Sequence, residues 1–461
     1  MSATSVPVRA KRELWSGRLG FILANIAAAV GLGSIWKFPY EVGTNGGGAF
    51  VLFYLVGLAL IVLPLMLAEL ALGRRGRSDA IRSILNVASA AEASPRWGFV
   101  GAIGVVAGFL ILSFYSVIGG WAIAYLVDTV RIGLPAGDAQ AAQARFDALL
   151  ASPLKLALYH LVFMAIASAI VARGIAGGIE EASKILMPML VLLIAALAVY
   201  SAIEGDLART LRFLFVLDAK HLTPQVALDA LGLGFFSIGV GLCILITYAA
   251  YAGPQIDLQQ VAIFTIVSDT AISFMAGFAV FPLVFAENLN PSGGPGLVFT
   301  TLAIAFARMP FGAIAAMAFF GLLTVAALGS AISFLELAVA PLRNALGWSR
   351  VHASLACGLA CWAVGLVSVL SFNLWAGWFP LAMIPLFANA TPYELIDHLT
   401  SNVLLPACGF GLAIFVGWVI PKQMLGEELG RLSPSSLALL RWLLRYLVPI
   451  GILAATTAPF L

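Results

Sequence analysis

The sequence predicts an all-α polytopic membrane protein. Of its 461 residues, 62% are hydrophobic and only 10% are charged, and the mean hydropathy is +1.02. Such a composition excludes an ordinary soluble domain. The apolar residues form long stretches, each close to the ~20 residues that a helix needs to cross a bilayer. Glycine and serine interrupt two of these stretches near their middle, which indicates broken helices.

About eleven candidate spans follow a polar, basic tail at residues 1–17. The tail lacks a cleavable signal pattern, because the first apolar stretch continues directly into the first broken span. The third and eighth stretches are long enough to tilt or to extend beyond the bilayer. The spans are expected near residues 18–39, 48–72, 97–129, 153–173, 179–203, 225–251, 260–286, 311–343, 351–371, 396–420 and 437–460.

Basic residues predict the orientation of the chain. Lysine and arginine are concentrated in the tail, in the second-to-third loop and in the tenth-to-eleventh loop, which share one side if every span crosses. By the positive-inside rule, that side is the cytoplasm. Residues 130–152 and 287–310 would then lie outside, and the latter, with a short apolar helix, would form either a lid or an ordinary surface loop.

The two interruptions are candidate binding sites. The first lies at Gly31 and Gly33, and Pro39 is expected to end that helix. The second lies at residues 236–241. Bare backbone groups are tolerated inside a bilayer only where protein or a water-filled cavity covers them. The alternative for Gly31 and Gly33 is that they merely let two helices pack closely.

Breaks in the first and sixth spans indicate two inverted repeats of five spans. Half-helix N-termini would then offer amides to an anionic group, and unwound carbonyls would suit a hard cation such as sodium. The expected organisation is the tail at 1–17, a first repeat at 18–203, an extracellular connection at 204–224, a second repeat at 225–420, and a cytoplasmic loop with the last span at 421–461.

Histidine and cysteine form no catalytic or metal-binding pattern. The four histidines are scattered, and no nucleophile–base arrangement accompanies them. Cys357 and Cys361 are one helical turn apart but lack further ligands for a metal. Together with Cys243 and Cys408, they are expected to be small residues in apolar surroundings. The sequence therefore indicates neither an enzyme nor a nucleic-acid-binding protein, and it leaves the oligomeric state open.

Several motifs together resemble the neurotransmitter:sodium symporters, specifically their bacterial amino-acid transporters. The resemblance implies the leucine-transporter fold, a place in the bacterial inner membrane with the N-terminus in the cytoplasm, and sodium-coupled import of neutral hydrophobic (aliphatic or aromatic) L-amino acids. It covers nearly the whole chain and depends on RELWSGR at 12–18, AVGLGSIWKFP at 29–39, NGGGAF at 45–50, PLMLAE at 64–69, FFS at 235–237 and ITY at 246–248.

For a first sodium ion, the resemblance implies the carbonyl of Ala29 and the side chains of Ser34, Ser237 and Asp269. The family usually has asparagine at the positions of Ser34 and Asp269. A buried carboxylate in a membrane is costly without a cation. That cost favours Asp269 as a sodium ligand over Asp269 as a structural polar residue.

For a second sodium ion, the resemblance implies the carbonyls of Ala27, Val30 and Ala326 and the hydroxyl of Ser330. The family's further ligand falls at Gly329, which has no side chain. It therefore remains open whether one ion or two ions bind.

Chloride is not expected. Tyr54, Ser237 and Ser273 match the chloride site of related transporters, but Leu233 occupies the position of its glutamine. Asp269 would already supply negative charge there and would repel the anion.

For the substrate, the resemblance implies capture of an amino-acid backbone. The amides of Leu32 and Gly33, with the Tyr115 hydroxyl, would hold the carboxylate; Tyr115 could instead be an interfacial residue. The ammonium would bind the carbonyls of Ala29, Phe236 and Ser237 and the side chain of Ser330. The pocket for the substrate side chain would be formed by uncharged residues, namely Val30, Ile111, Phe114, Phe236, Gly239, Leu242, Phe334 and Ser330. A leucine-like and a tryptophan-like substrate both remain possible.

The resemblance also implies two gates. Lys37 and Asp397 match the outer ion pair, with lysine in place of arginine. At the inner side, Arg12 and Trp15 match the gating tail, with Tyr251 nearby. The usual aspartate partner falls at Asn344, so this gate is expected to be weaker or paired elsewhere. Each charge could equally be a solvated loop residue.

Two rival functions remain. The nearer rival is a proton-coupled transporter that uses Asp269 or Glu69. Glu69 in the second span and Glu336 in the eighth could have a proton role, although structural hydrogen bonding is at least as good an explanation. A sensor on the same scaffold would bind an amino acid without transporting it.

Overall fold

The computed structural model describes residues 13–134, 139–288 and 297–457. These residues are almost entirely helical and contain no strand. Nine of their helices are long and apolar enough to cross a membrane, and the bent pair formed by Arg18–Ala29 and Gly33–Thr44 makes a tenth span. Together with a shorter interrupted unit at 224–249, they follow the order of the expected spans. The prediction of an all-α polytopic membrane protein is confirmed.

The helices alternate with short π or 3₁₀ turns, labelled η. The first half contains α1 (Arg18–Ala29), η1 (Gly33–Lys37), α2 (Phe38–Thr44), α3 (Gly48–Gly57), η2 (Leu58–Val62), α4 (Leu63–Gly76), α5 (Ala80–Ala90), η3 (Pro95–Trp97), α6 (Gly98–Ile132), α7 (Ala139–Leu150), α8 (Pro153–Ala172), η4 (Ile175–Glu180), α9 (Glu181–Glu204), α10 (Leu207–Phe215) and η5 (Ala219–His221). The second half contains α11 (Pro224–Ile238), α12 (Ile244–Ala249), α13 (Leu258–Ala286), η6 (Leu297–Thr301), α14 (Leu302–Arg308), α15 (Gly312–Leu346), α16 (Arg350–Ser371), η7 (Pro385–Phe387), α17 (Pro392–His398), η8 (Leu399–Leu404), α18 (Leu405–Ile414), η9 (Phe415–Val419), α19 (Lys422–Glu428), α20 (Pro434–Trp442), η10 (Leu443–Leu447) and α21 (Val448–Thr457).

The expectation that Pro39 ends the first span is wrong. Pro39 lies in the first turn of α2, which continues to Thr44. The preceding turn is a π-helix, in which the amide of Phe38 donates to the carbonyl of Gly33. Proline is tolerated in the first turn of a helix because the amide that it lacks is not needed there. The wide π turn thus lets the chain continue through the proline.

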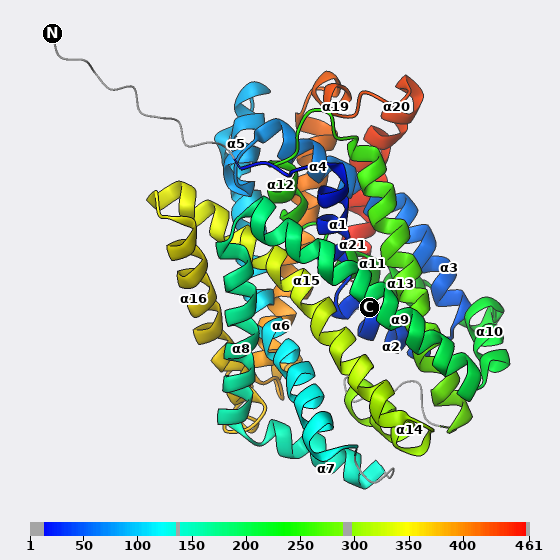
Figure 1. The fold of residues 1–461 in the computed structure, drawn as a ribbon. Helices are drawn as coiled ribbons and strands as arrows, with labels where there is room; N and C mark the ends of the chain where they lie inside the picture. Colours follow the sequence, from blue (N-terminus) through cyan, green and yellow to red (C-terminus); the bar gives the residue numbers. More distant parts are fainter. Residues whose placement is uncertain (1–12, 135–138, 289–296, 458–461) are drawn as a thin grey trace.

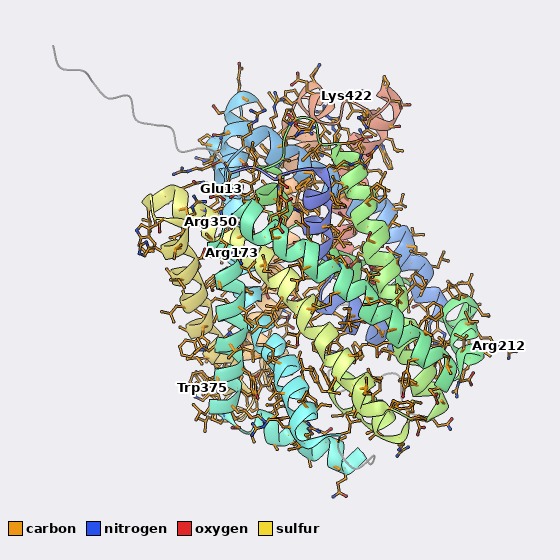
Figure 2. All side chains as sticks on the ribbon, in the orientation of Figure 1. Glu13, Arg173, Arg212, Arg350, Trp375 and Lys422 are labelled. Carbon is orange, nitrogen blue, oxygen red and sulfur yellow. The ribbon has the colours of Figure 1, made fainter. Side chains whose placement is uncertain are left out.

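The basic loops lie together at one end of the molecule. In Figure 1, α5, α19 and α20 share this end, whereas α7 and α14 lie at the opposite end. Figure 2 places Glu13, Arg173, Arg350 and Lys422 toward the first end and Trp375 far from it. This arrangement agrees with the loop sides expected from the charge pattern.

The two interrupted helices lie inside the bundle. α1 packs against α9, α13 and α15, α12 packs against α4, and α6 packs extensively along α15. Both breaks are lined by buried residues. The fold therefore encloses the two segments that the sequence marks as candidate binding sites.

Candidate functional site

The first break leaves the helical path at Val30, whose backbone is extended, and the helix resumes at Gly33 with a bend of 52°. A Cβ atom at Gly31 would lie 2.4 Å from the Ser330 hydroxyl and 2.7 Å from the Tyr115 hydroxyl. One at Gly33 would lie 3.1 Å from the Cα atom of Ser237. The helix is therefore broken at Gly31 and Gly33, and neighbouring elements also pack closely against both glycines.

The second break is longer and contains three left-handed residues. α11 ends at Ile238, and φ is +72° at Gly239, +83° at Gly241 and +62° at Cys243 before α12 begins. The fully buried Glu69 of α4 accepts a hydrogen bond of 2.5 Å from the amide of Gly241. Glu69 thus holds the unwound backbone, which agrees with the structural alternative for this carboxylate.

Asp269 and three hydroxyl groups form a buried cluster between the breaks. Ser34 Oγ lies 2.5 Å from Asp269 Oδ1 and 3.1 Å from Ser237 Oγ. Ser237 and Tyr54 both donate to Asp269 Oδ2, each at 3.3 Å. Three side chains of the predicted first sodium site therefore meet, and they come from η1, α11 and α13.

The cluster has the chemistry of a sodium site. Its donors are hard oxygens, and within the described residues no lysine or arginine forms an ion pair with Asp269. A buried carboxylate without a countercharge is costly, and a monovalent cation would supply that charge. Ala29, whose carbonyl is the fourth predicted ligand, is the last residue of α1 beside this cluster.

The elements of the second predicted sodium site also meet. A Cβ atom at Gly329 would lie 2.8 Å from the carbonyl oxygen of Ala27, and the Ser330 hydroxyl lies 3.5 Å from the carbonyl of Val30. Ala326 is fully buried one turn earlier on α15. Gly329 therefore lies against the Ala27 carbonyl, and the second sodium site stays a prediction.

A small cavity next to the cluster contains nearly all predicted substrate residues. Ala29, Leu32, Gly33, Ile111, Tyr115, Phe236, Ser237, Gly239, Leu242, Ser330 and Phe334 line it, and so do three residues that were not predicted, Ala28, Gly31 and Ile244. The amide of Leu32 donates to the Tyr115 hydroxyl at 3.2 Å. Tyr115 is 5% exposed, so the interfacial alternative for it is wrong.

Two predicted residues lie outside this cavity. Val30 is fully buried, and its carbonyl is directed toward Ser330. Phe114 lines a neighbouring outer pocket instead, where its ring packs against Tyr393 with the centroids 5.7 Å apart.

The outer gate residues share the outer pocket. Lys37 and Asp397 line it together with Tyr115 and Phe236. Lys37 Nζ lies 4.4 Å from the centroid of the Phe236 ring, and Asp397 accepts a hydrogen bond from Ser401 at 3.0 Å. In the described part of the chain, no ion pair joins Lys37 to Asp397.

The inner gate is tied by the tail. Arg12 lies outside the described residues. Trp15 donates through its indole to the carbonyl of Tyr248 at 2.9 Å and through its amide to the carbonyl of Tyr251 at 3.2 Å. The Tyr251 hydroxyl in turn donates to Glu336 at 2.8 Å. Trp15 and Tyr251 are therefore in direct contact, and their role as a gate stays a prediction.

A chain of ion pairs continues from these contacts. Glu13 binds Arg343 at 3.1 Å and Arg350 at 2.6 Å. Arg350 also forms an ion pair with the fully buried Glu336. The sequence analysis did not identify Glu13 or Arg350, although both lie beside predicted gate residues in the chain or in space.

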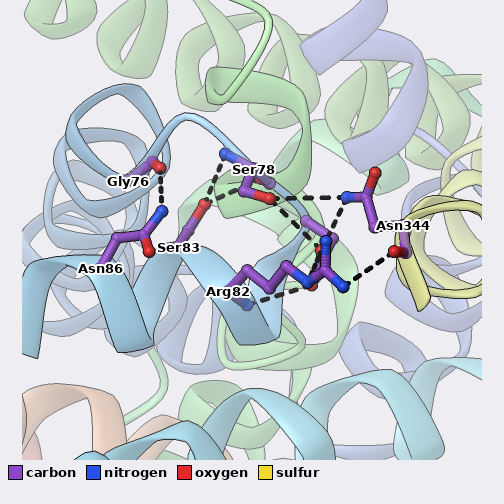
Figure 3. A network of polar contacts seen from close by, with 7 residues as sticks. Gly76, Ser78, Arg82, Ser83, Asn86 and Asn344 are labelled. Atoms are coloured by element: carbon purple, nitrogen blue, oxygen red, sulfur yellow. Dashed lines mark hydrogen bonds and ion pairs between the residues drawn. The ribbon is translucent and has the colours of Figure 1, made fainter.

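Asn344 is paired elsewhere. Its side-chain amide donates to Asp79 at 2.7 Å, and its backbone carbonyl accepts from Arg82 at 2.8 Å. Figure 3 shows this network at the α4–α5 loop. Asp79 also caps the N-terminus of α5. Glu13 therefore binds the tail to Arg343 and Arg350, whereas Asn344 binds the α4–α5 loop.

Comparisons with known proteins agree with this geometry. A family model described as the sodium:neurotransmitter symporter family matches residues 12–148 and 150–438. YhdH of Bacillus subtilis, an uncharacterized sodium-dependent transporter, is 35% identical over 443 residues, which cover 95% of this chain and 96% of that protein. An uncharacterized sodium-dependent transporter of Haemophilus influenzae is 31% identical over 453 residues, with 96% and 97% covered. The crystal structure of MhsT in complex with L-phenylalanine has a TM-score of 0.88 and 39% sequence identity, and the match covers 97% of this chain and 100% of MhsT.

Proposed function

The chain belongs to the sodium:neurotransmitter symporter family, and on that premise we propose that it couples sodium entry to import of neutral hydrophobic L-amino acids by alternating access. The family consists of transporters rather than enzymes, as predicted, and the likeness to MhsT confirms the leucine-transporter fold. The observation that carries the proposal is the Asp269 cluster next to an uncharged cavity between two broken helices.

The cavity supports an amino acid as substrate. The amides at the first break, one of which binds the Tyr115 hydroxyl, suit a carboxylate, and the carbonyls at the end of α1 and α11 suit an ammonium group. The remaining lining is apolar, with Ile111, Leu242 and Phe334. A neutral hydrophobic side chain therefore fits. The likeness to a protein crystallised with L-phenylalanine supports the same substrate class.

Sodium would act as a cross-link between moving elements. The side chains of Ser34, Ser237 and Asp269 belong to three separate helices, and a cation among them lowers the free energy of the state in which these helices approach. Coupling follows because the substrate cavity shares Ser237 with this cluster. A second ion would bind at Ala27, Val30, Ala326 and Ser330, and transport is proposed to be independent of chloride.

We place the protein in the bacterial inner membrane with its N-terminus in the cytoplasm. Arg173, Arg350 and Lys422 lie toward the same end of the molecule as Glu13, which supports this orientation. The similarity to two bacterial transporters supports a location in a bacterial membrane.

Uptake of labelled amino acids into proteoliposomes tests the proposal. We expect leucine, phenylalanine or tryptophan to accumulate far beyond one molecule per protein, and only with a sodium gradient. Accumulation that is equal in choline buffer at constant pH would support proton coupling instead. Binding without accumulation would support a sensor.

Asp269→Ala is the matching variant. We expect it to abolish sodium-dependent substrate binding, because the cation loses its only charged ligand in the cluster. Asp229→Asn on α11, whose side chain accepts from Gln225, is a control that removes a carboxylate away from the cluster. Unchanged sodium affinity in Asp269→Ala would remove Asp269 from the ligand set.

A further inference from the structure

Two cysteines that the transport mechanism does not use meet beside the second break. Cys243 and Cys408 are far apart in the sequence, yet their sulfur atoms lie 3.6 Å apart and both residues are fully buried. Cys243 is the last residue of the break, and Cys408 belongs to α18. The sequence analysis treated both as small residues in apolar surroundings, but two thiols in contact can be oxidised to a disulfide.

The surrounding helices hold the two thiols together. A Cβ atom at Gly104 of α6 would lie 2.7 Å from the sulfur of Cys243 and 3.1 Å from that of Cys408. The Cys408 thiol also donates to the carbonyl of Val100 at 3.3 Å. Only a glycine at position 104 leaves room for both sulfur atoms, so the three-helix junction fixes the pair at contact distance.

The backbone at Cys243 is not helical. Its φ of +62° is a conformation that residues other than glycine rarely adopt, and it follows two glycines with positive φ. The pair thus joins the unwound second break to the regular helix α18.

We propose that Cys243 and Cys408 form a reversible disulfide that locks the second break to α18 and arrests the transport cycle. Hydrogen peroxide oxidises one thiol to a sulfenic acid and is itself reduced to water. The second thiol then attacks the sulfenic sulfur and expels a second water. Two thiols and one peroxide therefore give one disulfide and two waters, and an external dithiol reverses the reaction by exchange.

Arrest of transport rests on the proposed function. Leu242, the residue before Cys243, lines the substrate cavity, and α12 begins at the residue after it. The other end of the segment carries Tyr248 and Tyr251, which bind the tail at the inner gate. Opening of the inner gate requires these residues to leave the tail. A covalent bond at the start of α12 opposes that motion.

The test treats the full-length protein in proteoliposomes with hydrogen peroxide. We expect a linked peptide that contains Cys243 and Cys408, at least a tenfold loss of amino-acid uptake, and recovery with dithiothreitol. Cys357→Ala, which removes another buried thiol on α16, should behave like the unmodified protein. Cys408→Ala should retain its uptake after oxidation. Absence of the linked peptide, or equal loss of uptake in Cys408→Ala, would overturn the lock.

Hydrogen exchange gives a readout that does not depend on the substrate. Oxidation should slow exchange of the α12 amides at least tenfold in the unmodified protein and leave Cys408→Ala unchanged. If the reduced protein imports no amino acid but this slowing is observed, the proposed function fails and the lock stands. If uptake is sodium-dependent but oxidation leaves exchange unchanged, the lock fails alone.

Discussion

The inner and outer ends of the molecule are closed by different kinds of contact. At the inner end, Glu13, Arg350 and Glu336 form a continuous series of ion pairs that links the tail to α15 and α16. At the outer end, Lys37 and Asp397 line one pocket without an ion pair between them, and Lys37 lies over the Phe236 ring. Of the two gates that the resemblance implies, the inner one is therefore held by ion pairs and the outer one is not.

This difference teaches where the free energy of the conformational cycle is stored. Glu336 is fully buried and Arg350 is nearly so, and removing one partner of a buried pair leaves an uncompensated charge. Lys37 and Asp397 are only half-buried, and contacts of that kind contribute little. Opening the inner gate should thus be the costly step, which binding of sodium and substrate must overcome.

Arg350→Met should have the largest effect. It leaves Glu336 without its cation, and Tyr251 alone remains as a partner. We expect a loss of about 3–5 kcal/mol in the free energy of unfolding. Thermal denaturation in detergent measures this decrease in stability, and the readout is the fraction of protein that remains monodisperse.

The matched control is the double variant Arg350→Met with Glu336→Met. Replacing both charges by apolar groups removes the buried unpaired carboxylate, so most of the stability should return. If the single and double variants are equally unstable, the effect of Arg350 comes from packing or from its bond to the carbonyl of Val171 rather than from the ion pair.

Glu13→Gln should have an intermediate effect. Glu13 is 29% exposed and binds two arginines, so we expect about 1–2 kcal/mol, between the values for exposed and buried pairs. The tail would still be attached by Trp15. Hydrogen exchange at Tyr248–Tyr251 should become faster by about 5–30-fold, because the population with an open inner gate rises.

Glu181→Gln is the control for this prediction. Glu181 also forms an ion pair, with Lys184, but at the surface of α9. Its loss should leave exchange at the inner gate unchanged. Equal acceleration in both variants would mean that the charge of the membrane surface, rather than the clamp on Glu13, controls the gate.

The sequence allowed both breaks to be predicted, because a helix break depends on local residue types, whereas the residues proposed for binding were assigned by resemblance. Paired glycines mark the places where a helix gives way, and a lone aspartate such as Asp269 in an apolar span marks a place where a cation is needed. Tyr115 and Ser330 were assigned by resemblance, and the structure brings both to the first break.

The partners of the inner gate could not be predicted in this way. Glu13 meets Arg343 and Arg350, which are more than three hundred residues away in the chain, and only the packing of α15 and α16 brings them together. The pairing of Asn344 with Asp79 likewise depends on where the α4–α5 loop lies. Charge complementarity indicates that such a residue needs a partner, but it does not indicate which one.

Lys37→Gln should have the smallest effect. In this structure the ammonium group contributes through the Phe236 ring, and such contacts are worth about 0.5–1 kcal/mol at partly exposed sites. The apparent affinity for substrate in proteoliposomes should therefore fall by only about two- to fivefold. Lys37→Arg, which keeps a cation over the ring, should be close to the unmodified protein.

A larger loss of substrate affinity would change the comparison between the inner and outer gates. If Lys37→Gln and Asp397→Asn each weakened substrate affinity tenfold or more, and the double variant were no worse than either, the two side chains would be coupled in the substrate-bound state. Lys37 and Asp397 already line the same pocket, so closure of that pocket would bring them together. The outer gate would then form its ion pair on closure, whereas the inner gate must break its own to open.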